Sequence, residues 1–99
     1  MAKRTKLIAG NCKMNGMRAE AAGFLAKLGS LHRAGAAGRR LLVCPPATLI
    51  PLMAEPLSEL DVLIGGQDCH AEAKGAHTGD LSAAMLADLG CSHVIVGHS

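Results

Sequence analysis

The sequence predicts an α/β chain built on a parallel sheet, because short apolar runs alternate with segments of helical periodicity over 99 residues. A parallel return needs a crossover connection, and a helix is the usual one. With 49% hydrophobic and 18% charged residues, the composition is that of a globular chain. Phe24 is the single aromatic residue, so the core must be aliphatic, which suits the branched interior of a β/α barrel.

The first strand is expected over residues 6–10, and Asn15-Gly16 is a turn signal. From about Arg18 to His32, apolar residues recur at helical spacing and predict one buried stripe: Ala21, Phe24, Leu25, Leu28 and Leu31. We expect Gly35 and Gly38 to end this helix.

The second strand is expected over residues 41–44 and is stopped by Pro45-Pro46. The following helix has Thr48 as its expected cap, because a threonine hydroxyl can accept a hydrogen bond from a first-turn amide. Pro51 falls in the first turn, where a missing N–H costs little, whereas Pro56 is expected to end or kink the helix.

The third strand is expected over residues 62–65, and the least regular part of the chain follows it. Residues 67–80 contain two histidines and no periodic apolar stripe, and such a long loop usually serves function or contacts a partner. Ser82 is expected to cap a short helix that runs through Leu89, with Gly90 as its left-handed stop.

The final run, VIVGHS over residues 94–99, predicts a fourth strand that is buried on both faces and delivers a histidine to its carboxyl end. In α/β folds the carboxyl ends of such strands hold the chemistry. His98 is therefore a candidate site residue. It follows Gly97, where the missing side chain permits close backbone approach. The alternative is a structural histidine with its hydrogen bonds satisfied.

Two architectures fit the alternation of strands and helices. A doubly wound nucleotide-binding sheet would have a glycine-rich phosphate turn after the first strand, but residues 10–15 read GNCKMN, and neither GxGxxG nor GK[ST] occurs at a strand end. A β/α barrel draws its site from several strand ends. Here the first strand offers Asn11 and Lys13 and the fourth offers His98, so the barrel is favoured.

Other classes of protein fit the sequence less well. The net charge is +2 and the basic residues form no stripe, so nucleic acid is not an expected partner. No apolar run has membrane length, so a membrane is not expected either. The four cysteines contain no CxxC pair, which is typical of reduced thiols in a cytoplasmic protein without a metal site: Cys12, Cys44, Cys69 and Cys91.

The string at residues 10–15 resembles the first-strand loop of the triosephosphate isomerase family. Residues 65–99, GGQDCHAEAKGAHTGDLSAAMLADLGCSHVIVGHS, are similar to the same family through its third loop, third helix and fourth strand. The resemblance implies a TIM (β/α)8 barrel. Residues 1–99 would be the amino-terminal part of that single domain, with the first four strands and three helices, truncated after the fourth strand.

The implied activity is the interconversion of dihydroxyacetone phosphate and D-glyceraldehyde 3-phosphate through an enediolate, in glycolysis and gluconeogenesis and without a cofactor. The family is a well-known worked example of pKa tuning and lid closure. By resemblance, His98 is a catalytic neutral imidazole that donates to the substrate oxygens. Lys13 is catalytic and binds substrate through its fixed positive charge, and Asn11 binds substrate beside it.

The family's carboxylate base and lid lie beyond the sixth strand, so the 99 residues alone are expected to be inactive. The family's third loop inserts into a neighbouring subunit, which implies a homodimer through residues 68–80, with Thr78, His77 and Gly79 at the interface. His77 replaces a common phenylalanine, while Cys12 and Ala71 also replace frequent aromatic residues, and these changes affect that contact.

Two other functions remain open at this point. One is a structural fragment, inactive alone, that associates with a separate carboxyl-terminal half of the barrel, and the other is a flavodoxin-like binding module.

Overall fold

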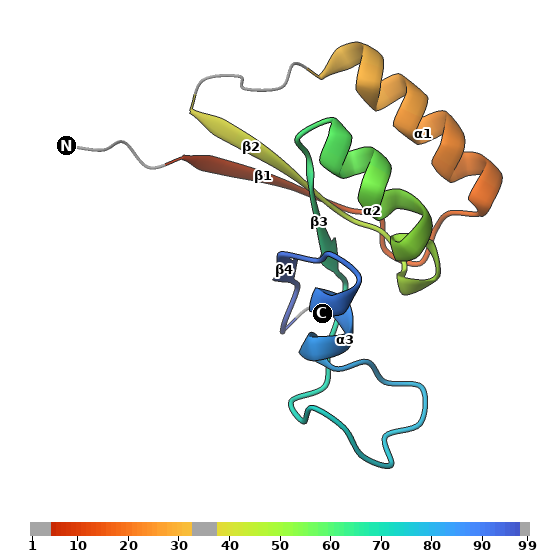
Figure 1. Ribbon diagram of the computed structural model, residues 1–99, viewed down its shortest axis with the longest axis vertical. Coiled ribbons are helices and arrows are strands. Elements are labelled where there is room, and N and C mark those ends of the chain that lie inside the picture. Colours follow the sequence, from red (N-terminus) through yellow and green to blue (C-terminus); the bar gives the residue numbers. More distant parts are fainter. Residues whose placement is uncertain (1–4, 33–37, 98–99) are drawn as a thin grey trace.

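In the computed structural model, which describes residues 5–32 and 38–97, four parallel strands run side by side and helices pack against them (Figure 1). The chain alternates strand and helix throughout, as the sequence predicts. The elements in order are β1 (Lys6–Asn11), α1 (Arg18–Leu31), β2 (Arg39–Cys44), a 3-10 turn (Ala47–Leu49), α2 (Ile50–Glu59), β3 (Leu63–Gly66), α3 (Ala83–Asp88) and β4 (His93–Val94).

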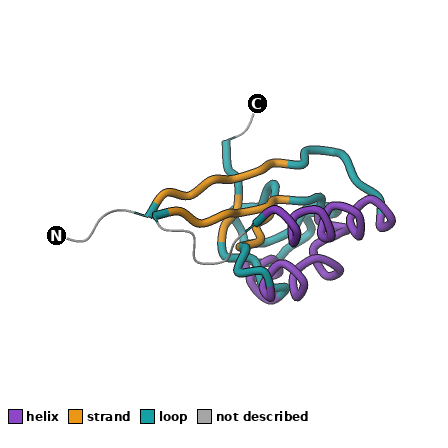
Figure 2. Tube along the Cα trace, turned by 90° about the horizontal axis from the view of Figure 1, so that it is seen from above, coloured by secondary structure: helices purple, strands orange, loops and turns teal. Residues whose placement is uncertain are grey.

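The strands follow one another in space in their sequence order, β1-β2-β3-β4, and every pair is parallel. Helices α1 and α2 lie together on one side of the sheet (Figure 2). A flavodoxin-like sheet would instead have a reversal of strand order and helices on both faces. The order and the one-sided helices are those of consecutive units of a β/α barrel, so the flavodoxin-like alternative is wrong.

The core lies between the sheet and its helices. Val43 of β2 and Ile64 of β3 contact a cluster of aliphatic side chains from the helices: Ala21, Leu49, Ile50, Met53, Leu57 and Leu86. Ile50 and Leu57 are fully buried. Because α2 supplies three of these residues at helical spacing, it is the helix that fixes β2 against β3.

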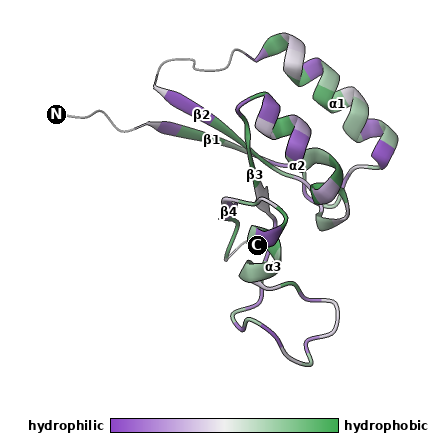
Figure 3. Ribbon diagram, in the orientation of Figure 1, coloured by the Kyte–Doolittle hydropathy of each residue, from purple (hydrophilic) through white to green (hydrophobic). Residues whose placement is uncertain are grey.

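Strand β1 is the least covered element of the sheet. All six of its residues are exposed, including Leu7 and Ile8, which point to opposite faces and are 45% and 49% accessible. Figure 3 shows that β1 and β2 are hydrophilic where they begin and hydrophobic beyond that point. In the described residues β1 pairs only with β2, so an apolar strand presents a free edge and two open faces.

The fourth strand is shorter and more exposed than the sequence predicts. It covers His93–Val94. The amide of Ile95 continues the ladder by donating to Gly66 O at 2.9 Å, whereas the Val96 side chain is 69% exposed. The prediction of a strand buried on both faces is therefore wrong for residues 94–97, because only one side is covered: Val94 packs against the core, whereas Val96 is open. His98 and Ser99 lie outside the described residues.

The helices also differ from expectation in detail. The stripe of α1 is only partly buried, since Ala21 is covered while Phe24 and Leu31 are 41% and 74% exposed. Thr48 caps nothing, because α2 begins after a 3-10 turn with no side-chain cap. Pro51 lies in the first turn as predicted, but Pro56 does not end α2.

Glycine and serine set the bounds of α3 but not the end of α1. The first helix ends at Leu31, where His32 is already extended, so Gly38, with its positive φ of 76°, does not cap it, and Gly35 is outside the described residues. Ser82 caps α3 by accepting a hydrogen bond from Met85 N at 3.2 Å, and Gly90 adopts a φ of 102° after it. Both α3 predictions are confirmed.

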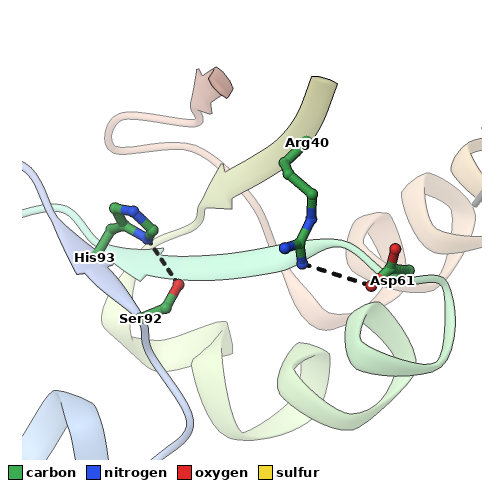
Figure 4. A network of polar contacts seen from close by, with 4 residues as sticks. All are labelled: Arg40, Asp61, Ser92 and His93. Atoms are coloured by element: carbon green, nitrogen blue, oxygen red, sulfur yellow. Dashed lines mark hydrogen bonds and ion pairs between the residues drawn. The ribbon is translucent and has the colours of Figure 1, made fainter. Parts of the chain in front are cut away.

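Two exposed polar pairs lie beside β3 (Figure 4). Arg40 Nη2 lies 3.5 Å from Asp61 Oδ1, just before β3 begins, and Ser92 Oγ lies 2.7 Å from His93 Nδ1, beside Gly65 of β3. The Arg40 and Asp61 side chains are 43% and 53% exposed, so their attraction is screened and contributes at most about 1 kcal/mol. The pair of Arg40 and Asp61 lies at the amino ends of β2 and β3, away from the carboxyl ends where Asn11 pairs with Cys44.

Candidate functional site

The loop that follows β1 begins at the carboxyl end of the sheet and is tied to β2 through its backbone. Asn11 is the last residue of β1 and pairs in register with Cys44, the last residue of β2. The amide of Cys12 continues the ladder by donating to Cys44 O at 3.1 Å. Asn15 Nδ2 donates to Cys12 O at 3.1 Å, so the loop is held at both its start and its turn.

Lys13 is held in an uncommon backbone conformation. Its φ is +55°, in the left-handed region that costs a residue with a side chain roughly 1–2 kcal/mol. Its amide donates to Asn11 Oδ1 at 2.8 Å, and its carbonyl accepts from Gln67 Nε2 at 2.7 Å. Strain of this kind persists where surrounding contacts determine it, and it is concentrated at functional sites.

Gln67 is a site residue that the sequence reasoning missed. It follows β3 directly, and its Nε2 donates both to Lys13 O and to Cys44 O, the latter at 3.0 Å. The side chain of Gln67, at the end of β3, therefore links the loop after β1 to the end of β2. The signal that selected Asn11, a polar residue just after an apolar strand, applies equally to Gln67 and could have found it.

Burial favours the thiol form of three cysteines near this end of the sheet. All four cysteines of the chain are free, and burial raises the pKa of Cys12, Cys44 and Cys91. For Cys44, which is fully buried, burial is the larger cause and the nearby thiols of Cys12 and Cys91 raise the pKa further. Since the thiolate is the nucleophile, these residues are not poised for nucleophilic chemistry.

The loop after Gln67 extends away from the sheet beyond α3 (Figure 1). Its base is closed by a hydrogen bond from His70 N to Leu81 O at 2.7 Å. At its far end Thr78 is exposed, Gly79 has a positive φ of 91°, and Asp80 N donates to His77 O at 3.0 Å. The three predicted interface residues thus lie together on an ordered, outward-facing turn.

Of the three predicted chemical residues, the structure brings two together. Asn11 and Lys13 meet through the 2.8 Å bond at the end of β1. His98 lies outside the described residues, so its approach to Lys13 stays a prediction. Gly97, immediately before it, has a φ of +68°, but no atom of the described residues, its chain neighbours aside, lies within 4 Å of the position of an added Cβ, so the close backbone approach expected at this glycine is not seen among them. Within residues 5–32 and 38–97, no group of three or more His, Cys, Asp or Glu side chains could hold a metal ion.

The sequential parallel sheet, with its strained polar turn at the carboxyl ends, defines an amino-terminal segment of a β/α barrel. A family model described as triosephosphate isomerase matches residues 6–99. The chain therefore belongs to the triosephosphate isomerase family, and the resemblance seen in its loops is confirmed.

Individual relatives agree with this assignment. The chain is 57% identical to the triosephosphate isomerase of Jannaschia sp. (strain CCS1) over 95 residues, covering 95% of this chain and 37% of that protein. It is 60% identical to that of Bradyrhizobium sp. (strain ORS 278) over 95 residues, covering 94% and 37%. The crystal structure of the Bartonella henselae enzyme superposes with a TM-score of 0.82 at 41% identity, covering 95% of this chain and 38% of that one.

The chain thus spans a little over a third of the length of these relatives. Among the described residues, no helix is both long and apolar enough to cross a membrane.

Proposed function

We propose that the protein carrying this segment is a triosephosphate isomerase, which interconverts dihydroxyacetone phosphate and D-glyceraldehyde 3-phosphate without a cofactor. The observation that carries the proposal is the left-handed turn at Lys13, held by Asn11 and Gln67 from two different strand ends. Family membership supplies the reaction, and the turn supplies a fixed cation where a barrel enzyme binds its substrate.

The chemistry accounts for each residue type. Removing a proton next to a carbonyl leaves negative charge on oxygen, and that charge is stabilised by donors fixed before the reaction begins. Lys13 supplies a positive charge for the substrate phosphate and the enediolate. Asn11, whose Oδ1 is engaged by the Lys13 amide, keeps its Nδ2 as a donor for substrate. His98 supplies the neutral imidazole that donates to the substrate oxygens and moves a proton between them.

Gln67 acts on this machinery through Lys13. Its two hydrogen bonds fix the Lys13 carbonyl to the end of β2, so the backbone that carries the lysine does not have to be reoriented when substrate arrives. Positioning of this kind lowers the entropic part of the barrier. We therefore assign Gln67 as a positioning residue.

The proposal includes two partners. A second copy of the protein would be contacted through the loop 68–80, because Thr78 and Gly79 lie exposed on its outward turn. The remaining strands of the barrel, in the same or a separate chain, would cover the free edge and open faces of β1, where Leu7 and Ile8 are half exposed. We also propose a cytoplasmic location, since a reducing compartment suits free thiols at all four cysteines.

The test is a steady-state assay of the full-length protein with each triose phosphate, comparing Lys13→Met with Lys27→Met. Lys27 is exposed on α1, away from the strand ends, and makes a matched control for the loss of one positive charge. We expect kcat/KM to fall by roughly 100-fold or more for Lys13→Met, as when a preorganised electrostatic group is lost, and to stay near wild type for Lys27→Met. Equal activity in the two variants would refute the assignment.

A further inference from the structure

Asn15 lies two residues after Lys13, on the same turn as Asn11 but outside the residues assigned to substrate. Its Nδ2 donates to Cys12 O at 3.1 Å, and Asn11 Oδ1 accepts from Lys13 N at 2.8 Å. The Cys12 carbonyl and the Lys13 amide belong to one peptide group. The two asparagine side chains therefore hold the two polar ends of a single peptide plane, the one that leads into Lys13.

The orientation of this plane determines the φ of Lys13. A peptide group is planar, so it reorients only by rotating as a unit between its two Cα atoms. Turning the Cys12–Lys13 plane over by half a turn would change the φ of Lys13 from +55° to about −125°, inside the extended region that residues with side chains favour. The strained form therefore depends on the hydrogen bonds made at this plane.

The neighbouring peptide planes are held by other strands. Gln67 Nε2 binds the Lys13 carbonyl, which belongs to the next plane along the chain. The Cys12 amide, which donates to Cys44 O, belongs to the preceding plane. Among the hydrogen bonds of the described residues, only those of the two asparagines reach the plane between them. Without Asn15, half of what holds that plane is lost.

We propose that Asn15 is a positioning residue for the isomerase reaction, which keeps the Cys12–Lys13 peptide from turning over and so holds the Lys13 ammonium where substrate binds. When the plane turns, the backbone nitrogen of Lys13 moves and the direction of its Cβ changes with it. The long side chain magnifies that change at Nζ. A misplacement of about 1 Å near the reacting atoms costs up to ~100-fold in rate.

The alternative is an asparagine that serves only the turn. Asn15 is exposed and is followed by Gly16, a pair that is common in turns. A residue of that kind stabilises the fold, and its loss lowers the free energy of unfolding while folded molecules keep their kinetics. A positioning residue changes the kinetics and the affinity for phosphate in molecules that remain folded. The kinetic role rests on the proposed function, whereas the conformation of the turn does not.

The experiment uses the full-length protein and compares Asn15→Leu, which has a similar shape but no amide, with Ser30→Ala. Ser30 Oγ donates to Lys27 O at 2.9 Å, so this control on α1 also loses one exposed bond to a carbonyl three residues earlier. In Asn15→Leu, kcat/KM should fall and the inhibition constant of inorganic phosphate should rise, each by roughly 2- to 10-fold, the factor for one hydrogen bond. In Ser30→Ala both should match wild type.

Two further measurements separate position from stability. In NMR spectra, the three-bond coupling between the amide and α protons of Lys13 depends on φ, and in Asn15→Leu it should increase toward the value of an extended residue. In a double-mutant cycle with Lys13→Met, the effect of Asn15→Leu on kcat/KM should vanish, because the cation that Asn15 positions is absent.

Three results would each overturn the proposal: an unchanged Lys13 coupling in Asn15→Leu, constants equal to those of Ser30→Ala, and an equal loss of kcat/KM in the Lys13→Met background. Wild-type activity of Lys13→Met alone would refute the proposed function and with it the kinetic role of Asn15. The coupling would still show whether Asn15 holds the turn, so the two failures are distinguishable.

Discussion

Replacing Gly65 by alanine should destabilise the sheet at the junction of β2, β3 and β4. The added methyl group would lie 2.9 Å from Cys44 Sγ, 3.0 Å from His93 O and 3.3 Å from Leu42 Cδ1. His93 O belongs to the strand that pairs with Gly65, so it cannot yield without disturbing that pairing. Overpacking of this kind costs about 1–3 kcal/mol, while the lower entropy of the unfolded chain returns about 0.4–1 kcal/mol. The difference is a net loss of roughly 0 to 2.6 kcal/mol, centred at about 1.3 kcal/mol.

The assay is urea unfolding of the full-length protein followed by circular dichroism, with Gly10→Ala as the matched control. Gly10 lies in β1, which pairs with β2 rather than with β3, and its nearest atom to an added methyl group is Leu42 O at 4.0 Å, an ordinary contact. The control should be neutral or slightly stabilised. If Gly65→Ala unfolds at the same urea concentration as Gly10→Ala, the close approach of β3 to Cys44 and His93 does not constrain this position.

Two further predictions follow from single side chains. Gln67→Met keeps the side-chain volume but removes the donor to Lys13 O and Cys44 O. The free energy of unfolding should fall by about 1–3 kcal/mol for the two bonds, and kcat/KM should fall as well. Steady-state rates that match wild type would contradict the positioning role. Ser82→Ala removes the acceptor for Met85 N and should lower the free energy of unfolding by about 1 kcal/mol, whereas Ser82→Gly should lower it by less. Thermal unfolding that ranks the two variants in the opposite order would contradict the capping assignment.

Local rules predicted the parts of this fold in which one residue determines its own surroundings. The alternation of apolar runs with helical segments predicted the parallel strands, Ser82 predicted the start of α3, and Gly90 its end. The loop strings predicted the family. Local rules were wrong at Thr48, because a 3-10 turn replaces the expected cap, and Pro56 lies inside α2 instead of ending it. Backbone geometry at those points is set by how α2 packs, with Ile50 and Leu57 fully buried.

The sequence by itself determined the order of elements, because spacing and residue type are sufficient for that, and its resemblance to a family supplied the expectations for Asn11, Lys13 and His98 and for a loop at a subunit contact. Only the tertiary structure decided that Lys13 is left-handed, that Gln67 holds it, and that His70 and His77 stack. Each of these contacts joins residues whose distance in space depends on strand register or loop closure. Periodicity reports which face a residue occupies, but it does not report which partner the fold brings to that face.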